Sequence, residues 1–228
     1  MKSKMQKRSY EQWCGCARSL DILGERWTLL VVRDLLVGPK RYTDLLEGLP
    51  GIGTNLLARR LRELEAKRIV EKADLPPPSG ATVYRLTPRG LALEPVVFAL
   101  ARWGSQFLGK PRPTDAMLPD PFFLSLRASF QPERAQGRTE RYAFAIGDRR
   151  FTVDVADGKP VIREGEATAP AATITADTAT LVALRRRELT TRQALASGRV
   201  RVEGDPKALD RFLDVFAWSK ESLAAIGV

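Results

Sequence analysis

The feature of this sequence that most constrains its fold is a cluster of prolines near the middle of the chain. Within 13 residues stand Pro111, Pro113, Pro119 and Pro121. Proline lacks a backbone N–H and disfavours helix in the residue before it, so the segment predicts an extended connector. We therefore expect one domain over residues 1–108, a proline-rich linker over residues 109–121 and a second domain over residues 122–228.

The positive charge of the chain is concentrated in the first of these domains. Lys and Arg total 37 against 27 Asp and Glu, which gives a net charge of +10. Residues 1–115 hold 20 basic and 12 acidic side chains, a net +8, whereas residues 116–228 hold 17 and 15, a net +2. The excess favours a polyanionic partner for the first domain.

Several residue types are missing, and their absence excludes whole classes of function. The chain has no histidine and only two cysteines, Cys14 and Cys16. A Ser-His-Asp device, a Cys-His device and a His-ligated metal site are therefore impossible, and two cysteines alone do not complete a zinc cage. No run of about 18–20 apolar residues could cross a bilayer, and the basic start lacks the apolar region of a secretory signal. We expect a cytoplasmic protein that is not an enzyme and that needs no cofactor or metal.

The pattern of apolar residues in the first domain predicts helices followed by a hairpin and a further helix. The expected helices cover residues 26–37, 42–47 and 54–67, the expected strands cover residues 69–73 and 82–86, and a long helix is expected after Thr87. Thr87 can cap that last helix, with Pro88 at its first position. This layout is typical of a winged helix-turn-helix domain, with the proline-rich loop 75–81 as the tip of the wing.

The helix expected over residues 54–67 has two contrasting faces. At 100° per residue, Leu57, Leu61 and Leu64 share one side and are predicted to face the core. The other side carries the candidate base contacts Asn55, Arg59 and Arg62. Asn and Arg match the hydrogen-bonding edges of adenine and guanine in the major groove. The alternative is an ordinary solvated basic face beside a core stripe.

Three further basic residues near this helix are candidate phosphate contacts. They are Lys40, Arg41 and Arg60. Contacts to phosphate would supply salt-dependent affinity that does not depend on base sequence. Each of the three can instead be ordinary surface charge.

Residues from about 14 to 108 resemble the HxlR-type family of bacterial winged-helix transcriptional regulators. The resemblance rests on the motifs Cys14-x5-Leu20-Asp21-x2-Gly24-x-Arg26-Trp27, Gly38-Pro39-Lys40-Arg41-Tyr42-x2-Leu45, Gly51-Ile52, Leu57-x3-Leu61-x2-Leu64, Tyr84-x-Leu86-Thr87-x2-Gly90 and Trp103. It implies homodimerisation through terminal helices and binding to a double-stranded DNA operator. One departure concerns the start of the recognition helix, where the family usually has Ser after Gly-Ile and this chain has Gly53-Thr54. Thr54 can supply the missing hydroxyl cap if the helix begins one residue later.

Cys14 stands where some relatives of this family carry a redox-sensing thiol. A sensor thiol needs a lowered pKa and access to oxidant. A disulfide to Cys16 across one residue would be badly strained, so oxidation would favour an intermolecular bond. We favour the alternative, in which Cys14 is a small buried thiol on an apolar helix face.

In the second domain, apolar and polar residues first alternate as in β-strands, and apolar residues later recur at helical spacing. Strands are expected over residues 139–146, 151–156, 161–162, 172–175 and 199–203, helices begin at Asp177 and Thr190, and Asp205-Pro206 is expected to open a final helix. The order of strands and helices predicts an α+β domain of about 100 residues. The whole chain is therefore predicted to be α+β, an N-terminal winged helix followed by this domain.

The second domain resembles the sterol carrier protein fold, mainly through the motif Gly198-x-Val200-x-Val202-x-Gly204-Asp205. That family encloses an apolar tunnel for hydrophobic molecules, whereas Arg185, Arg186 and Arg187 replace its shorter turn. By resemblance, the residues predicted to line such a cavity are Phe122, Phe123, Leu126, Leu181, Leu184, Leu195, Phe212 and Phe216. The alternative for each of them is a filled core.

Together these patterns predict a homodimeric transcriptional regulator whose second domain senses a hydrophobic small molecule. A ligand changes DNA affinity only by its preference between two conformations, so a fused pocket would suit a sensor. The competing hypothesis is a lipid-binding or carrier protein in which the first domain only dimerises.

Overall fold

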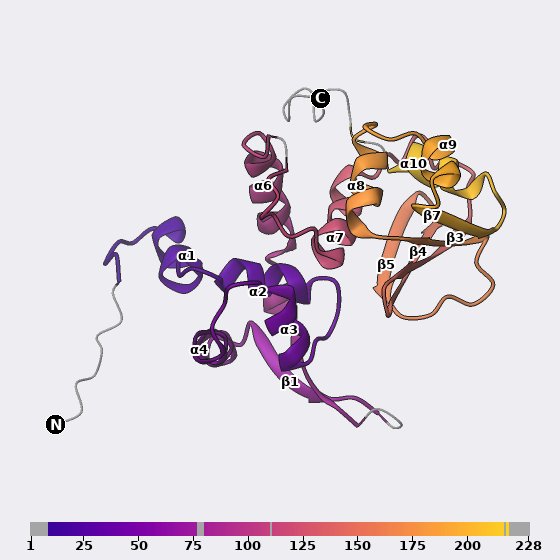
Figure 1. The fold of residues 1–228 in the computed structure, drawn as a ribbon. Helices are drawn as coiled ribbons and strands as arrows, with labels where there is room; N and C mark the ends of the chain where they lie inside the picture. Colours follow the sequence, from indigo (N-terminus) through magenta and orange to yellow (C-terminus); the bar gives the residue numbers. More distant parts are fainter. Residues whose placement is uncertain (1–8, 77–79, 110, 217, 219–228) are drawn as a thin grey trace. The chain divides into compact units, whose positions relative to one another are not determined.

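The computed structural model describes residues 9–76, 80–109, 111–216 and 218. Its internal contacts divide the chain into two compact units, residues 1–97 and residues 98–228. The two units are described separately, and Figure 1 shows the helices and strands of each. The predicted fold class, α+β with a winged helix-turn-helix first, is confirmed.

The first unit is a bundle of helices with a two-stranded hairpin. Its elements are α1 (Gly15–Leu23), α2 (Thr28–Leu35), α3 (Tyr42–Gly48), α4 (Thr54–Ala66), β1 (Val70–Asp74), β2 (Thr82–Leu86), α5 (Pro88–Leu91) and the start of α6 (Glu94–Ser105). The strands β1 and β2 pair antiparallel with Val70 opposite Leu86. Val31, Leu45 and Leu57 are fully buried and form part of the core that holds the helices together.

The last helix of the first unit is interrupted, which the sequence pattern did not predict. Thr87 caps α5 as expected, because its side chain accepts a hydrogen bond from the backbone N–H of Gly90. A Cβ at Gly90 would lie 2.2 Å from the carbonyl oxygen of Ile69, so only glycine allows this close approach. The chain then leaves helical geometry after Leu91 and α6 begins separately at Glu94.

The second unit is a five-stranded mixed sheet with helices. Its elements are α7 (Pro119–Ser129), β3 (Glu140–Ile146), β4 (Arg149–Ala156), β5 (Lys159–Glu164), β6 (Ala172–Ala176), α8 (Thr178–Arg185), α9 (Thr191–Ala196), β7 (Val200–Gly204) and α10 (Ala208–Val215). The strand order is β5-β4-β3-β6-β7, and β3 pairs with β6 in parallel while the other neighbours are antiparallel. The predicted turn at Asp157-Gly158 is confirmed, with φ of 52° and 66°.

Aromatic rings join the helices to one face of this sheet. Phe212 of α10 lies against Tyr142 and Phe144 of β3, with ring centroids 5.4 and 4.8 Å apart. Phe123 of α7 stacks on Phe151 of β4 at 4.1 Å. Since Phe151 is the register partner of Phe144, α7 and α10 cover the same face of the sheet.

The starts of two helices in the second unit differ from the sequence prediction. The helix α7 begins at Pro119, inside the segment expected to be extended, because proline at a first helical turn has no intrahelical N–H bond to lose. The final helix α10 begins at Ala208 rather than at Asp205-Pro206. Asp205 instead accepts a hydrogen bond from the backbone N–H of Lys207, at 2.9 Å. Within the described residues, every helix is too short or too polar to span a bilayer.

Candidate nucleic-acid interface

The helix α4 is anchored by a leucine stripe, as the sequence predicted. Leu57, Leu61 and Leu64 are at most 1% exposed. The helix is capped by Gly53, and no side chain supplies a cap bond. The predicted hydroxyl cap by Thr54 is therefore wrong, since Thr54 is already the first helical residue. Its carbonyl oxygen accepts a hydrogen bond from the Tyr42 hydroxyl at 2.7 Å, which ties the start of α4 to α3.

The opposite side of α4 presents polar and basic side chains to solvent. Thr54, Asn55, Arg59 and Arg62 are all exposed. Asn55, Arg59 and Arg62, the three predicted base contacts, lie within about 60° of one another around the helix, whereas Thr54 lies nearer the leucine side. We call Asn55, Arg59 and Arg62 the α4 outer face. Their contact with bases stays a prediction.

Arg60, predicted as a phosphate contact, is buried. Its side chain is 3% exposed and donates to Glu25 at 2.6 Å, to Glu63 at 2.7 Å and to the backbone oxygen of Arg26 at 3.1 Å. The prediction is wrong because Arg60 lies three residues after Leu57 and four before Leu64, on the edge of the core stripe. The same helical geometry that identified the stripe would have identified this position.

Lys40 was also predicted to hold phosphate and is also buried, at 2% exposure. Its backbone forms a bridge with Tyr84 of β2, through N–H···O distances of 2.9 and 2.7 Å. A residue that is only 2% exposed does not present its side chain to a phosphate, so the prediction is wrong. Arg41, the next residue, is exposed and remains a candidate phosphate contact.

Hydrogen bonds join the two strands at the described base of the β1–β2 hairpin, which is the expected wing. Thr82 donates to the Asp74 carboxylate at 2.7 Å, and the Leu75 N–H donates to the Ala81 carbonyl oxygen at 3.0 Å. Arg85 pairs with Glu71 across the strands at 2.8 Å. The tip residues 77–79, which belong to the predicted wing, lie outside the described residues.

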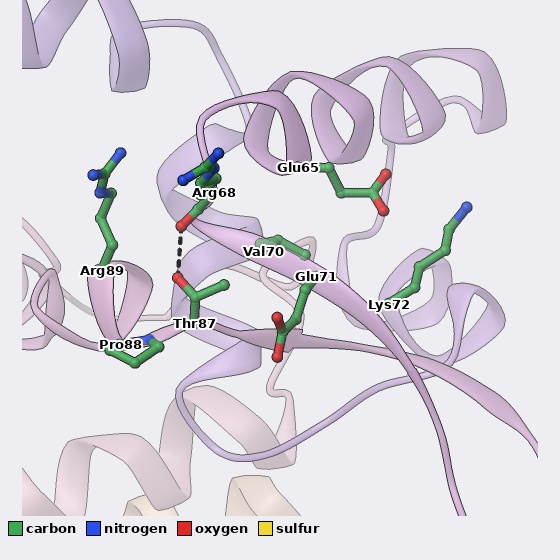
Figure 2. Close-up of a pocket in the computed structure, with 8 residues that line it drawn as sticks. All are labelled: Glu65, Arg68, Val70, Glu71, Lys72, Thr87, Pro88 and Arg89. Carbon is green, nitrogen blue, oxygen red and sulfur yellow. Dashed lines mark hydrogen bonds between the residues drawn. The ribbon is translucent and has the colours of Figure 1, made fainter.

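A polar surface hollow of about 490 Å³ lies where α4, the hairpin and α5 meet. Figure 2 shows the residues that line it, Glu65, Arg68, Val70, Glu71, Lys72, Thr87, Pro88 and Arg89. The Thr87 hydroxyl donates to the Arg68 carbonyl oxygen at 2.6 Å, which fixes the hairpin to the end of α4. Three cations and two carboxylates make this hollow a poor site for an apolar molecule.

The residues predicted to line an effector cavity lie mostly in a filled core. Phe122, Phe123, Leu126, Leu181, Leu184, Phe212 and Phe216 are at most 4% exposed. Phe122 meets Phe123 at 5.2 Å and Phe212 meets Phe216 at 4.8 Å, so the rings pack directly on one another. Leu195 was wrongly assigned to this set, because it is 40% exposed on the short helix α9. A surface hollow of about 340 Å³ adjoins this core and is lined in part by Leu184, Leu189 and Leu213.

Arg185, noted in the sequence only as a departure from the family, is buried in the second unit. It is 4% exposed and donates to the Ser125 hydroxyl at 2.7 Å, the Ser129 hydroxyl at 2.6 Å and the Phe216 carbonyl oxygen at 3.2 Å. Its guanidinium carbon lies 5.4 and 5.3 Å from the rings of Phe122 and Trp218. Burial lowers the pKa of Arg185 to about 9.

The two cysteines are exposed, so the favoured interpretation of Cys14 as a buried thiol is wrong. Cys14 is the N-cap of α1. Hydrogen bonds from the backbone N–H groups of Ala17 and Cys16 lower the pKa of the Cys14 thiol. A redox role for Cys14 stays a prediction.

The apolar side chains in and just after α6 are mostly exposed. Val96, Leu100, Trp103 and Phe107 are between 45 and 70% exposed, whereas Val97 is buried. The rings of Trp103 and Phe107 touch, with centroids 5.0 Å apart.

Comparison with known families assigns both halves of the chain. Residues 22–112 match the HxlR-like helix-turn-helix family, and residues 124–217 match the SCP-2 sterol transfer family. The HTH-type transcriptional regulator YodB of Bacillus subtilis is 39% identical over 89 residues, which cover 39% of this chain and 80% of YodB.

Two solved structures are also similar to parts of the chain. The reduced form of YodB from B. subtilis is 37% identical with a TM-score of 0.38, and the match covers 46% of this chain and all of that one. The sec-alkylsulfatase Pisa1 from Pseudomonas sp. is 23% identical with a TM-score of 0.43. That match covers 45% of this chain, which spans only 17% of the sulfatase.

Proposed function

The chain belongs to the HxlR-like helix-turn-helix family, and on this premise we propose that it is a transcriptional regulator that binds operator DNA through the α4 outer face. The proposal is supported above all by Asn55, Arg59 and Arg62, which project from a helix whose leucine side is fully anchored. A rigid helix of this kind can enter the major groove with its donors already positioned. The exposed Arg41 supplies a nearby phosphate contact.

The proposal is tested with variants of the α4 outer face in the full chain. Operator fragments are first obtained by selecting bound genomic DNA and footprinting it. We expect Arg59→Ala to weaken operator binding by about 1–3 kcal/mol, because a bidentate contact to guanine is lost. Arg62→Ala is measured in the same way. Arg192→Ala, which removes an exposed arginine from α9, is the matched control and should bind like the parent.

The result that contradicts the proposal is equally specific. If Arg59→Ala and Arg62→Ala both bind operator and random-sequence DNA like the parent, the α4 outer face is not the recognition surface.

We further propose that the regulator is a cytoplasmic homodimer without catalytic activity, joined through the apolar face of α6. Uncovered Trp103, Phe107 and Leu100 support this, because such a face is costly to leave in water. Two recognition helices related by a two-fold axis would bind two half-sites about one helical turn apart. Footprints that show a single, unrepeated half-site would contradict this arrangement.

The second domain is proposed to sense a hydrophobic small molecule. The match to the SCP-2 sterol transfer family supports this. Thermal-shift screening of hydrophobic metabolites should yield a compound that also changes operator affinity. Compounds that bind without changing affinity would separate the domain from regulation.

The competing function is a lipid carrier whose first domain only dimerises. It predicts transfer of lipid between vesicles together with no steep salt dependence of DNA binding. Both measurements use the same full-length preparation, so the two functions are compared directly.

A further inference from the structure

The loop between α1 and α2 is fastened to the recognition helix by one buried guanidinium. Arg60 of α4 donates to the Glu25 carboxylate at 2.6 Å and to the Arg26 carbonyl oxygen at 3.1 Å, and both acceptors lie in this loop. The next residue, Trp27, has a φ of 79°, an unfavourable left-handed conformation for a bulky side chain. A strained loop of this kind persists only when its neighbours hold it in place. Arg60 therefore fixes the position of Glu25 relative to α4.

Arg59, the central cation of the α4 outer face, shares both carboxylates that bind Arg60. Its guanidinium lies 3.9 Å from Glu25 and 3.6 Å from Glu63, whereas the corresponding Arg60 distances are 2.6 and 2.7 Å. The short contacts belong to the buried arginine and the long ones to the exposed arginine. Arg59 can thus leave both carboxylates without breaking a short hydrogen bond.

We propose that Glu25 is a positioning residue that restrains Arg59 in the free protein and thereby lowers the affinity of the chain for DNA. This inference rests on the proposed function. Its side chain is 58% exposed, so its negative charge faces whatever approaches the α4 outer face. Sequence-independent binding depends on net positive charge, and a carboxylate at this position reduces it.

The relative strengths of the competing contacts set how much DNA affinity the restraint costs. An exposed ion pair such as that between Arg59 and Glu25 is worth at most about fivefold in an equilibrium constant. A bidentate contact between arginine and guanine is worth about 5- to 150-fold in discrimination. Arg59 therefore leaves Glu25 for a correctly placed guanine, and the energy of the ion pair is lost in every complex in which it does so. The carboxylate consequently lowers binding to the operator at least as much as binding to random DNA.

The test replaces Glu25 with an uncharged residue that keeps its hydrogen-bonding oxygen. In Glu25→Gln the amide oxygen can still accept from Arg60, and Arg60 retains Glu63 and the Arg26 carbonyl, so the loop stays fastened. Glu65→Gln on the same helix is the matched control, because it removes the same charge away from Arg59. Both full-length variants are titrated with a random-sequence 30-base-pair duplex and with the selected operator, over a range of salt concentrations.

We expect Glu25→Gln to bind the operator about two- to fivefold more tightly, and the random duplex more tightly by the same factor or a smaller one. The salt dependence on random DNA should become steeper as Arg59 engages phosphate. In an Arg59→Ala background, the effect of Glu25→Gln should shrink to the small charge effect of Glu65→Gln, which a merely structural role of Glu25 would not predict. Glu65→Gln should change both affinities by a similar, small factor.

Three outcomes overturn the inference. If Glu25→Gln and Glu65→Gln have the same affinities for both duplexes, Glu25 has no special role. An effect that persists unchanged in the Arg59→Ala background shows that Glu25 acts by another route. A parent protein that binds neither duplex overturns the proposed function as well, whereas the first two outcomes leave DNA binding intact.

Discussion

The first unit of this chain buries Arg60 almost completely and the second buries Arg185 and Arg186, and Arg60 and Arg185 are compensated in opposite ways. Arg186 resembles Arg60, because it pairs with the Glu188 carboxylate at 2.6 Å. Arg60 in the first unit is 3% exposed, and Arg185 in the second is 4% exposed. Arg60 has two carboxylates as acceptors. Arg185 has two serine hydroxyls, a carbonyl oxygen and two aromatic rings, and within the described part of the chain none of the carboxylates pairs with it.

Arg60 and Arg185 differ in whether a partly exposed carboxylate balances the buried positive charge. The carboxylates that bind Arg60 are 58 and 40% exposed, so only one member of the cluster is removed from water. The charge of Arg185 is removed from water without an anion beside it, and a buried unpaired charge is costly. The first arrangement stabilises its unit and reaches the proposed DNA surface, whereas the second is a cost that hydroxyls and rings offset only in part.

The largest effect that tests this comparison is expected for Arg60→Met. The variant loses two charge-assisted hydrogen bonds and releases the loop around Trp27, and partial exposure of the carboxylates limits the loss. We expect the free energy of unfolding of the first unit to fall by about 2 kcal/mol. Pulse proteolysis in urea, with surviving fragments identified by mass, measures each unit separately. Arg62→Met on the exposed side of α4 should change it by less than about 0.5 kcal/mol; equal losses would contradict the comparison.

A smaller effect is expected for Arg185→Met. Methionine fills a similar volume, and the Ser125 hydroxyl keeps its own acceptor, the Phe122 carbonyl oxygen at 2.7 Å. Replacing a buried charge that lacks an anion with an apolar side chain is often neutral or stabilising. We expect the unfolding free energy of the second unit to stay within about 1 kcal/mol of the parent value or to rise. A loss as large as that of Arg60→Met would show that the two arginines are equally well compensated.

The smallest effect concerns pH. Burial lowers the pKa of Arg185 to about 9 in the folded unit, whereas in the unfolded chain the pKa has its much higher ordinary value. Between these values the unfolded chain binds more protons, so stability rises with pH, and the full cost of the charge is present below about pH 9. Relative to Arg185→Met, the parent should gain about 0.4 kcal/mol between pH 8 and 9. The same proteolysis measurement at the two pH values detects it, and a constant difference would show that Arg185 stays charged throughout.

Much of the fold was predictable because periodicity and turn residues act locally. The leucine stripe Leu57-Leu61-Leu64, the cap at Thr87 and the turn at Asp157-Gly158 each depend on neighbouring residues, and each prediction is confirmed. The break between α5 and α6 was not predicted, because the apolar pattern continues across it.

The candidate site was less predictable, because exposure depends on residues distant in sequence. The buried Arg60 donates to Glu25, which lies 35 residues away, and the backbone of the buried Lys40 pairs with that of Tyr84. Both residues were predicted to bind phosphate from their charge alone, and their burial contradicts that prediction. The prediction for Cys14 was wrong in the opposite direction. Its thiol was expected to be buried, and it is exposed at the start of α1.

The parallel pairing of β3 with β6 has a consequence for how the protein is made. In the register of these two central strands, Tyr142 lies opposite Ala172, with an antiparallel meander between them in the sequence. Strand β3 cannot pair with β6 until the ribosome has released β6. The winged unit consists mainly of contacts between residues close in sequence, which form early. During synthesis, the winged unit is therefore expected to mature first, and the apolar side of β3 must meanwhile be kept from aggregating.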